Sequence, residues 1–242
     1  RAKWGKFASW YIKTGERNAV RFANEIIVLS QGVKEYFWNT YKRKTCFISN
    51  GVSRPEIREA REIKEFGLVK DNYILYLGRI VPEKGEHYLI KAFKEIETDK
   101  KLVIAGGISD TAEYGRELKN LAKDDDRVIF TGFVQGRLLE ELYSNAYVYC
   151  LPSDLEGMPL SLLEAMSYGN CCLTSDIEEC SEVVENRAVT FKKSNAEDLK
   201  NKLGWLISHE KEVQKYKDEA ADFICNKYSW DDVVEKTLNL YR

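Results

Sequence analysis

Short apolar runs alternate with amphipathic stretches along most of this chain of 242 residues. Runs rich in Val, Ile, Leu and Tyr predict strands at 25–30, 45–49, 73–77, 101–105, 127–131, 147–151, 171–174 and 188–191. Helical periodicity predicts helices at 32–42, 85–97, 112–123, 137–145, 159–168, 178–185, 195–208, 210–226 and 230–241. Continuous apolar strands that alternate with helices are typical of a parallel sheet covered on both faces. We therefore predict an α/β fold.

The composition excludes several classes of protein. A hydrophobic share of 44% and a charged share of 31% are ordinary for a globular protein with a large core. A net charge of −2 argues against a dedicated nucleic-acid binder. We see no signal peptide and no apolar run of about 18 residues, so we expect no membrane-spanning segment. No G-x-G-x-x-G follows a predicted strand, which disfavours a nicotinamide or flavin dinucleotide site.

The chain has six cysteines and two histidines. The cysteines form no C-x2-C pattern, and three of them, Cys150, Cys171 and Cys172, lie in apolar strand-like runs. We interpret these three as buried free thiols of a reducing compartment, which favours a cytoplasmic protein. His87 lies among apolar helix positions, where a structural role is favoured over a catalytic one. We expect no metal site and no cofactor.

The segment EGMPLSLLEAM, residues 156–166, joins a loop to an apolar helix. Pro159 suits the first helical turn and Gly169 suits the C-terminal cap. Glu156 lies in the loop and Glu164 inside the helix, so the two carboxylates can hold different parts of one extended ligand. Free N–H groups and the positive dipole end at the helix start suit a phosphate between them. Such a ligand, with hydroxyls at both ends and phosphate in the middle, is a nucleotide sugar.

A second candidate site follows the strand predicted at 73–77. Lys84 comes at a helix start, where it opposes the dipole at a cost of roughly 0.3–1 kcal/mol. An unfavourable charge of this kind at the carboxyl end of a strand indicates a functional site. A diphosphate held by Arg79, Lys84 and nearby N–H groups would remove the conflict. The alternatives are two solvated charges, or neutralisation of Lys84 by Glu83.

Both candidate sites belong to a wider pattern: the chain resembles the retaining glycosyltransferases of family 4 (glycosyl transferases group 1), which have the GT-B fold. Five segments carry the resemblance, in order: YILYLGRIVPEKGEHYLIKA (73–92), VIFTGFV (128–134), VYCLPSDLEGMPLSLLEAMSYG (148–169), EECSEVV (178–184) and YSWDDVVEKTLNLY (228–241). The resemblance implies a Rossmann-like donor lobe. It also implies three domains: 1–53, the end of an acceptor lobe; 54–228, the donor-binding domain; and 229–242, a helix that crosses back.

The resemblance also implies roles for single residues. Arg79 and Lys84 would stabilise the departing nucleoside diphosphate, and Glu156 would contact the donor sugar. Glu164 would hold the ribose hydroxyls. The residues implied in donor binding are Gly78, Gly132, Phe133, Val134, Gly157, Met158, Pro159, Leu160 and Glu164. The sequence alone does not decide whether Phe133 is a core residue or a surface on which the nucleobase stacks. It also does not decide whether Gly106-Gly107 allows a close backbone approach or forms a tight turn.

The function implied is transfer of a sugar, with retention and without a metal, from a nucleotide sugar to a glycan, lipid-linked or small-molecule acceptor. UDP is the expected nucleotide, with GDP and ADP open. Two alternatives remain: a nucleotide-sugar-binding lobe that needs a separate acceptor subunit, and a phosphorylase-like enzyme.

Residues 1–44 carry ten basic and three acidic side chains, a net charge of +7, together with nine aromatic residues. Such a basic aromatic segment can contact an anionic membrane, here at its cytoplasmic face, or a lipid-phosphate acceptor. Packing against further protein explains it as well.

Overall fold

The computed structural model describes residues 5–107 and 112–241. The chain divides into two compact units, one made of Arg1–Asn50 with Trp230–Arg242 and the other of Gly51–Ser229. The smaller unit therefore draws on both ends of the sequence. The assignment of the two units to an acceptor lobe and a donor lobe stays a prediction.

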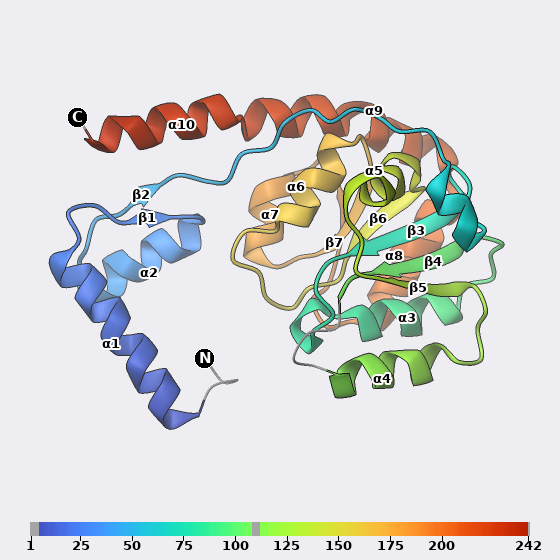
Figure 1. Ribbon diagram of the computed structural model, residues 1–242, viewed down its shortest axis with the longest axis horizontal. Helices are drawn as coiled ribbons and strands as arrows, with labels where there is room; N and C mark the ends of the chain where they lie inside the picture. The colour runs from blue at the N-terminus through green and yellow to red at the C-terminus, as the bar shows by residue number, and fades with distance from the viewer. Residues whose placement is uncertain (1–4, 108–111, 242) are drawn as a thin grey trace. The chain divides into compact units, whose positions relative to one another are not determined.

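The larger unit is built on a six-stranded parallel sheet (Figure 1). Its strands are β3 (Tyr73–Leu77), β4 (Lys101–Ala105), β5 (Val128–Gly132), β6 (Val148–Leu151), β7 (Cys171–Ser175) and β8 (Val189–Phe191). They lie in the order β5-β4-β3-β6-β7-β8, so the strand order reverses between β3 and β6. In open parallel sheets, ligands bind outside the carboxyl ends of the strands at this reversal.

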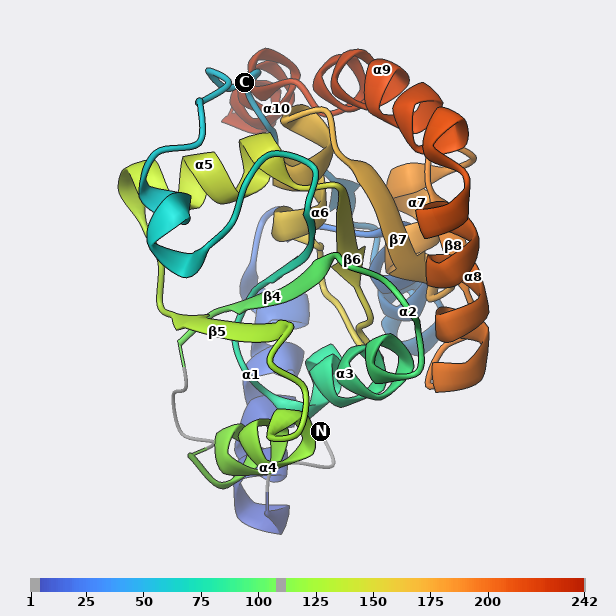
Figure 2. The ribbon, with the colours of Figure 1, turned by 90° about the vertical axis from the view of Figure 1, so that its right-hand side faces the viewer.

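Helices cover both faces of this sheet (Figure 2). Those that follow the strands are α3 (Glu86–Lys94), α4 (Ala112–Ala122), α5 (Gly136–Asn145), α6 (Leu160–Ser167), α7 (Glu178–Val184), α8 (Ala196–Ser208) and α9 (Glu210–Lys227). Helix α3 packs against α4 and α8, whereas α6 packs against α9. The predicted parallel sheet with helices on both faces is confirmed.

Apolar side chains on both faces of the strands form the core. Every residue of β6 and β7 is buried, and Tyr73–Tyr76 of β3 are fully buried. Cys150, Cys171 and Cys172 lie in these strands as buried free thiols, as predicted. Their burial raises the pKa of each thiol, so they are packing residues rather than nucleophiles.

The smaller unit contains a short parallel strand pair with helices around it. Its elements are α1 (Lys6–Phe22), β1 (Ile27–Val28), α2 (Gln31–Tyr41), β2 (Cys46–Phe47), α10 (Trp230–Leu238) and the 3₁₀ turn η3 (Asn239–Tyr241). Helix α2 begins after Ser30, whose Oγ accepts a hydrogen bond of 3.3 Å from the Val33 N–H. The helix predicted to reach residue 241 leaves α geometry after Leu238. Among the described residues, no helix combines the length and apolar character needed to cross a bilayer.

Helix α1 is absent from the sequence-based prediction, and it is the largest omission. Gly15 lies inside it, and Gly5 at its N-terminus offers no side-chain cap. Both features weaken the usual helix signals. Phe7, Trp10 and Tyr11, however, follow the i, i+3, i+4 spacing of one helical face. That spacing was the signal that could have found the helix.

Candidate functional site

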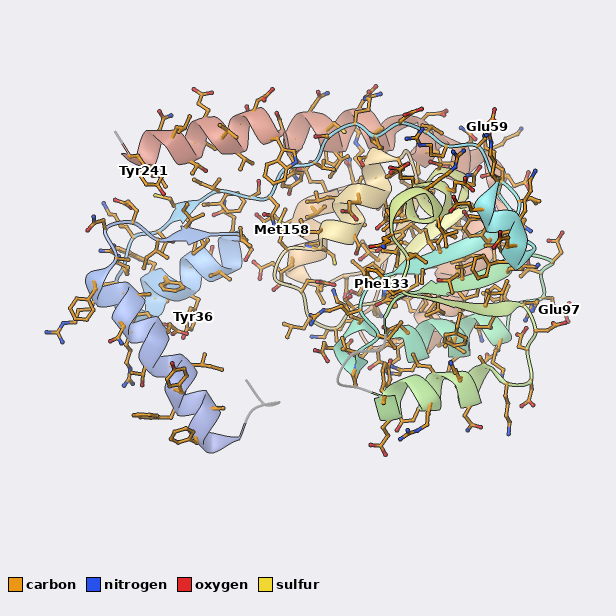
Figure 3. All side chains as sticks on the ribbon, viewed as in Figure 1. Tyr36, Glu59, Glu97, Phe133, Met158 and Tyr241 are labelled. Carbon is orange, nitrogen blue, oxygen red and sulfur yellow. The ribbon has the colours of Figure 1, made fainter. Side chains whose placement is uncertain are left out.

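The predicted site residues gather at the carboxyl ends of the parallel strands. Gly78 and Arg79 follow β3, and the loop with Glu156 follows β6, so both flank the reversal of strand order. Phe133 and Met158, both labelled in Figure 3, lie in the loops after β5 and before α6. The topology therefore places these loops at one edge of the sheet.

An ion pair joins Lys84 to Glu156 at the centre of this edge. The distance from Lys84 Nζ to Glu156 Oε1 is 2.6 Å, and the two side chains are only 14% and 6% exposed. Ser153 Oγ donates a second hydrogen bond of 2.6 Å to the same carboxylate oxygen. The alternative of a solvated charge is therefore wrong for Lys84, whose side chain is largely withdrawn from water, as is that of Glu156. Lys84 pairs across the site with Glu156, a residue that follows a different strand.

Backbone geometry holds the two loops of this ion pair together. Lys84 ends a 3₁₀ turn, η2 (Pro82–Lys84), and Gly85 follows it with φ +74° before α3 begins. A Cβ on Gly85 would lie 2.1 Å from the Pro152 carbonyl oxygen. The Asp154 N–H donates a hydrogen bond of 2.8 Å to the Glu83 carbonyl. Only glycine satisfies both the positive φ and the close approach at this corner.

Arg79 is exposed, and its guanidinium makes no ion pair or hydrogen bond with another described residue. Its carbonyl oxygen accepts a hydrogen bond of 2.9 Å from the Tyr76 hydroxyl, which fixes the backbone at the end of β3. A guanidinium without a partner among the described residues, in the same loop as Lys84, favours an anionic ligand.

A cavity of about 510 Å³ brings the residues after β3 together with those after β5. Its lining includes Gly78, Arg79, Gly106, Phe133 and Val134. Phe133 is 73% exposed, so the interpretation of this side chain as core is wrong. Val134, by contrast, is buried and belongs to the core cluster as well as to the cavity wall.

Two glycines shape this cavity for different reasons. A Cβ on Gly106 would lie 1.9 Å from the Gly78 carbonyl oxygen, so the close backbone approach is the correct explanation there. Gly132 has φ +73° with open space around it, so it is needed for the turn itself. Together they let the ends of β3, β4 and β5 approach one another.

The start of α6 offers fewer free N–H groups than the sequence suggests. Helix α6 begins at Leu160, with Pro159 as its N-cap. The Leu160 N–H donates to the Met158 carbonyl at 2.9 Å, so it is not available to a ligand in this conformation. At the other end, Gly169 with φ +77° closes the helix, as predicted.

Glu164 is exposed on α6, and its Oε2 accepts a hydrogen bond of 3.1 Å from the buried Tyr143 hydroxyl. Loss of hydration raises the pKa of this carboxyl, and the Tyr143 hydrogen bond opposes that rise. Tyr143 also stacks on Tyr168, with ring centroids 5.2 Å apart. The sequence did not predict a role for Tyr143, because no local pattern links it to Glu164, which lies 21 positions away. Ser153 was missed as well, although its S-x-x-E spacing before Glu156 was visible.

Comparison with known proteins identifies the family. The model of the family described as glycosyl transferases group 1 matches residues 56–223. This chain belongs to that family. The matched range contains the sheet, the Lys84–Glu156 ion pair and α6.

Relatives of known sequence agree with this assignment. The chain is 28% identical to an uncharacterised glycosyltransferase of Methanocaldococcus jannaschii, over 90% of the chain and 60% of that protein. It is 26% identical to a Campylobacter jejuni protein, N,N'-diacetylbacillosaminyl-diphospho-undecaprenol alpha-1,3-N-acetylgalactosaminyltransferase, over 99% of the chain and 72% of that protein.

Among solved structures, HepE from Anabaena, determined with UDP and glucose, superposes with a TM-score of 0.84. The match covers 95% of this chain and 65% of HepE at 19% identity. This likeness establishes that the chain shares the GT-B fold of these structures. The chain spans less than two thirds of HepE and of the Methanocaldococcus protein.

Proposed function

We propose that this group 1 glycosyltransferase chain belongs to the retaining family 4 and binds a UDP-sugar at the carboxyl ends of β3 and β6. The observation that carries the proposal is the buried Lys84–Glu156 ion pair, together with an exposed Arg79 in the same loop as Lys84 that has no side-chain partner in the described part of the chain. In this proposal the two cations would contact the diphosphate, and the carboxylate would contact hydroxyls of the sugar. The structure of HepE with UDP and glucose, which shares this fold, supports UDP as the nucleotide.

In this proposal, Arg79 and Lys84 offset the charge that grows on the leaving diphosphate. Lys84, held by Glu156 and only 14% exposed, is a fixed cation of the kind that stabilises such charge better than water does. They take the part that a metal ion has in other transferases, so no metal is needed. The diphosphate would lie alongside Lys84 Nζ, which has donors to share beyond its bond to Glu156.

Glu156 would accept hydrogen bonds from hydroxyls of the donor sugar, with Lys84 and Ser153 fixing its orientation. Glu164, held by Tyr143, would accept from the ribose hydroxyls. Phe133 would lie beside the base, with Gly132 and Val134 shaping the turn. The backbone of Gly157–Leu160 would face the sugar and diphosphate, which requires the Leu160 N–H to leave the Met158 carbonyl on binding.

For the reaction, the acceptor hydroxyl would attack the anomeric carbon on the face that the diphosphate leaves. The bond from carbon to the phosphate oxygen breaks with its electron pair going to the diphosphate, and the acceptor proton passes to that phosphate. The configuration is retained. The C. jejuni relative, named for a diphospho-undecaprenol acceptor, supports a lipid-linked acceptor in glycoconjugate synthesis. Residues 1–44 would then contact the cytoplasmic face of the membrane.

Calorimetric titration with UDP, GDP and ADP, first in EDTA and then with magnesium, tests this proposal. We expect UDP to bind best and equally with or without the metal. Lys84→Ala should weaken UDP at least about tenfold, the loss of one charge-assisted contact. Lys91→Ala, at an exposed position of α3, is the matched control and should change nothing. Unchanged affinity of the Lys84 variant would reject the site.

A further inference from the structure

A cavity of about 360 Å³ lies within the smaller unit and shares no residue with the proposed donor site. It is lined by two residues of α2 and by three that lead into β2: Lys34, Trp38, Arg43, Lys44 and Thr45. Lys42 ends α2 with φ 52°, a left-handed conformation, after which the chain turns toward β2. The volume is near the lower end of the range for small-molecule sites, roughly 300–1,000 Å³, so the cavity suits a small group.

The charge around this cavity has one sign. Of its five described lining residues, three are cations and none is an acid. The Lys34 and Lys44 side chains are exposed, and neither ammonium makes a hydrogen bond or ion pair with another described residue. A concave surface lined by charge of one sign raises the local concentration of ligands of the opposite sign. The cavity therefore favours an anion.

Arg43 is fixed in place by backbone carbonyls. Its Nη2 donates hydrogen bonds of 2.7 Å to the carbonyl oxygens of Ala23 and Asn24. Its Nε is buried and has no hydrogen-bond partner among the described residues. A guanidinium that is already positioned and still has a donor to offer suits an oxyanion, because it loses less rotamer freedom when the anion binds.

Thr45 contributes a second unsatisfied donor. Its side chain is only 8% exposed, and Oγ1 is buried without a hydrogen-bond partner in the described part of the chain. Such a hydroxyl destabilises the fold, whereas valine would fill the same space without that cost. A ligand oxygen would supply the missing acceptor. Because both unsatisfied atoms are closed to bulk water, the exposed Lys34 and Trp38 side chains would have to shift to admit it.

Trp38 adds an apolar surface beside these cations. Its indole is 47% exposed, and the Lys42 ammonium lies 5.9 Å from the ring centroid. Trp38 follows Lys34 by four positions, so the two share one face of α2. An exposed indole next to ammonium groups can hold an apolar chain and its anionic head together. A free phosphate would leave the indole without a ligand contact.

We propose that this cavity binds a phosphoryl group carried on an apolar chain. Lys34, Arg43 and Lys44 would contact the phosphoryl oxygens, Thr45 would donate its hydroxyl to the same group, and Trp38 would contact the chain. The inference deepens the proposed function and rests on it in one respect, since the lipid-linked acceptor proposed there carries such a group. The cavity itself belongs to the smaller unit, and its binding of phosphate does not require UDP.

NMR titrations with octyl phosphate, below the concentration at which it forms micelles, and with inorganic phosphate test this inference. The amide signals of Lys44 and Thr45 report binding at the cavity. We expect octyl phosphate to bind at least about tenfold more tightly, because each methylene group that leaves water adds about fourfold in affinity. Trp38→Ala should remove this preference and keep the binding of inorganic phosphate. Equal affinity of the wild type for the two ligands would overturn the lipid assignment.

Two pairs of substitutions separate a built site from general attraction to positive charge. Lys34→Ala with Lys44→Ala should weaken octyl phosphate by about tenfold or more, since two charge-assisted contacts are lost. The matched control, Lys13→Ala with Lys236→Ala, removes two exposed lysines of the same unit that do not line the cavity, and should change the affinity about twofold or less. Equal weakening by the two pairs would overturn the site.

Thr45→Val tests the buried hydroxyl. We expect octyl phosphate to bind about two- to tenfold more weakly, and the melting temperature of the free chain to rise, because a buried hydroxyl without a partner has been removed. A hydroxyl with a purely structural role would instead lower the melting temperature when it is lost. That result would overturn the contact between Thr45 and the ligand.

The same spectra separate this inference from the proposed function. Residues 78–84 report the donor site when UDP is added, whereas Lys44 and Thr45 report the cavity when octyl phosphate is added. Shifts of Lys44 and Thr45 without any response to UDP would retain the phosphoryl site and reject the UDP site. Absence of those shifts would overturn the inference even if UDP binds.

Discussion

Gly85 and the Pro152 carbonyl meet so closely that no side chain fits between them. The corner that carries Lys84 therefore rests directly on the backbone of the loop that carries Glu156. Two loops from neighbouring strands thus form one rigid wall of the candidate site, and the ion pair crosses their junction.

Gly85→Ala should destabilise the protein by more than about 3 kcal/mol. The new Cβ would meet the Pro152 oxygen at 2.1 Å, and φ +74° is strained for alanine. Urea unfolding measures the effect. Gly204→Ala, in the open interior of α8, is the matched control, and we expect it to add roughly 0.5–1 kcal/mol of stability. Comparable losses in both variants would contradict the close-approach explanation.

Removing one partner of the Lys84–Glu156 pair should cost more stability than removing both. Each single change, Lys84→Met or Glu156→Gln, leaves a largely buried charge uncompensated, at roughly 3–5 kcal/mol. The double variant leaves no such charge. A double-mutant cycle from urea unfolding should therefore give a coupling energy above about 1 kcal/mol. Additive losses would show that solvent screens the pair.

Stability should fall as the pH rises through the titration range of Glu86. Its pKa rises from 4.5 unfolded to about 7 folded, so the folded chain holds the proton more tightly. The stabilising contribution is complete below the unfolded pKa and is lost by about pH 7. Glu86→Gln lacks this dependence and should gain roughly 3 kcal/mol on the wild type between pH 4.5 and 8. Parallel stability curves for the two proteins would contradict the raised pKa.

Tyr143→Phe should weaken the binding of UDP and leave the binding of inorganic pyrophosphate unchanged. The hydroxyl lowers the pKa of Glu164 and fixes its carboxylate, so its loss affects only the ribose contact. We expect a loss of about 0.5–1.5 kcal/mol in UDP binding by calorimetry. Equal weakening of both ligands would indicate a general structural defect instead.

Phe133→Ala should keep the stability within about 0.5 kcal/mol, because the side chain is 73% exposed. If the ring stacks on the base, UDP binding should weaken by roughly 1–3 kcal/mol. Thermal unfolding and calorimetry on the same preparation measure both quantities. Leu155→Ala, another exposed apolar residue of these loops at 62% exposure, controls for a general loss of surface. Unchanged UDP affinity in the Phe133 variant would remove the ring from the base site.

Much of the fold follows from periodicity in the sequence. The strands predicted at 73–77 and 101–105 have these bounds in the structure, because a run of buried apolar residues between turns is hard to mistake. Helix α1 is absent from the prediction, because Gly15 and the charged residues of this segment obscure the helical spacing of its aromatic residues. The strands at 25–30 and 45–49 shrink to two residues each, since only a short pair forms between them.

The sequence placed Lys84 and Glu156 in one site but did not pair them. They are 72 residues apart, and their contact depends on the course of two loops. The hydrogen bond between Tyr143 and Glu164 could not be predicted for the same reason. A Tyr near the end of one helix and a Glu inside another each look ordinary alone. Their contact exists only because the fold brings the two helices together.

The smaller unit closes only when Trp230–Arg242 joins the first fifty residues. During synthesis the first fifty residues emerge before the segment they need, because the whole of the larger unit lies between the two in the sequence. The larger unit, continuous from Gly51 to Ser229, can fold as soon as it has emerged. The smaller unit therefore cannot be complete until the larger unit has emerged.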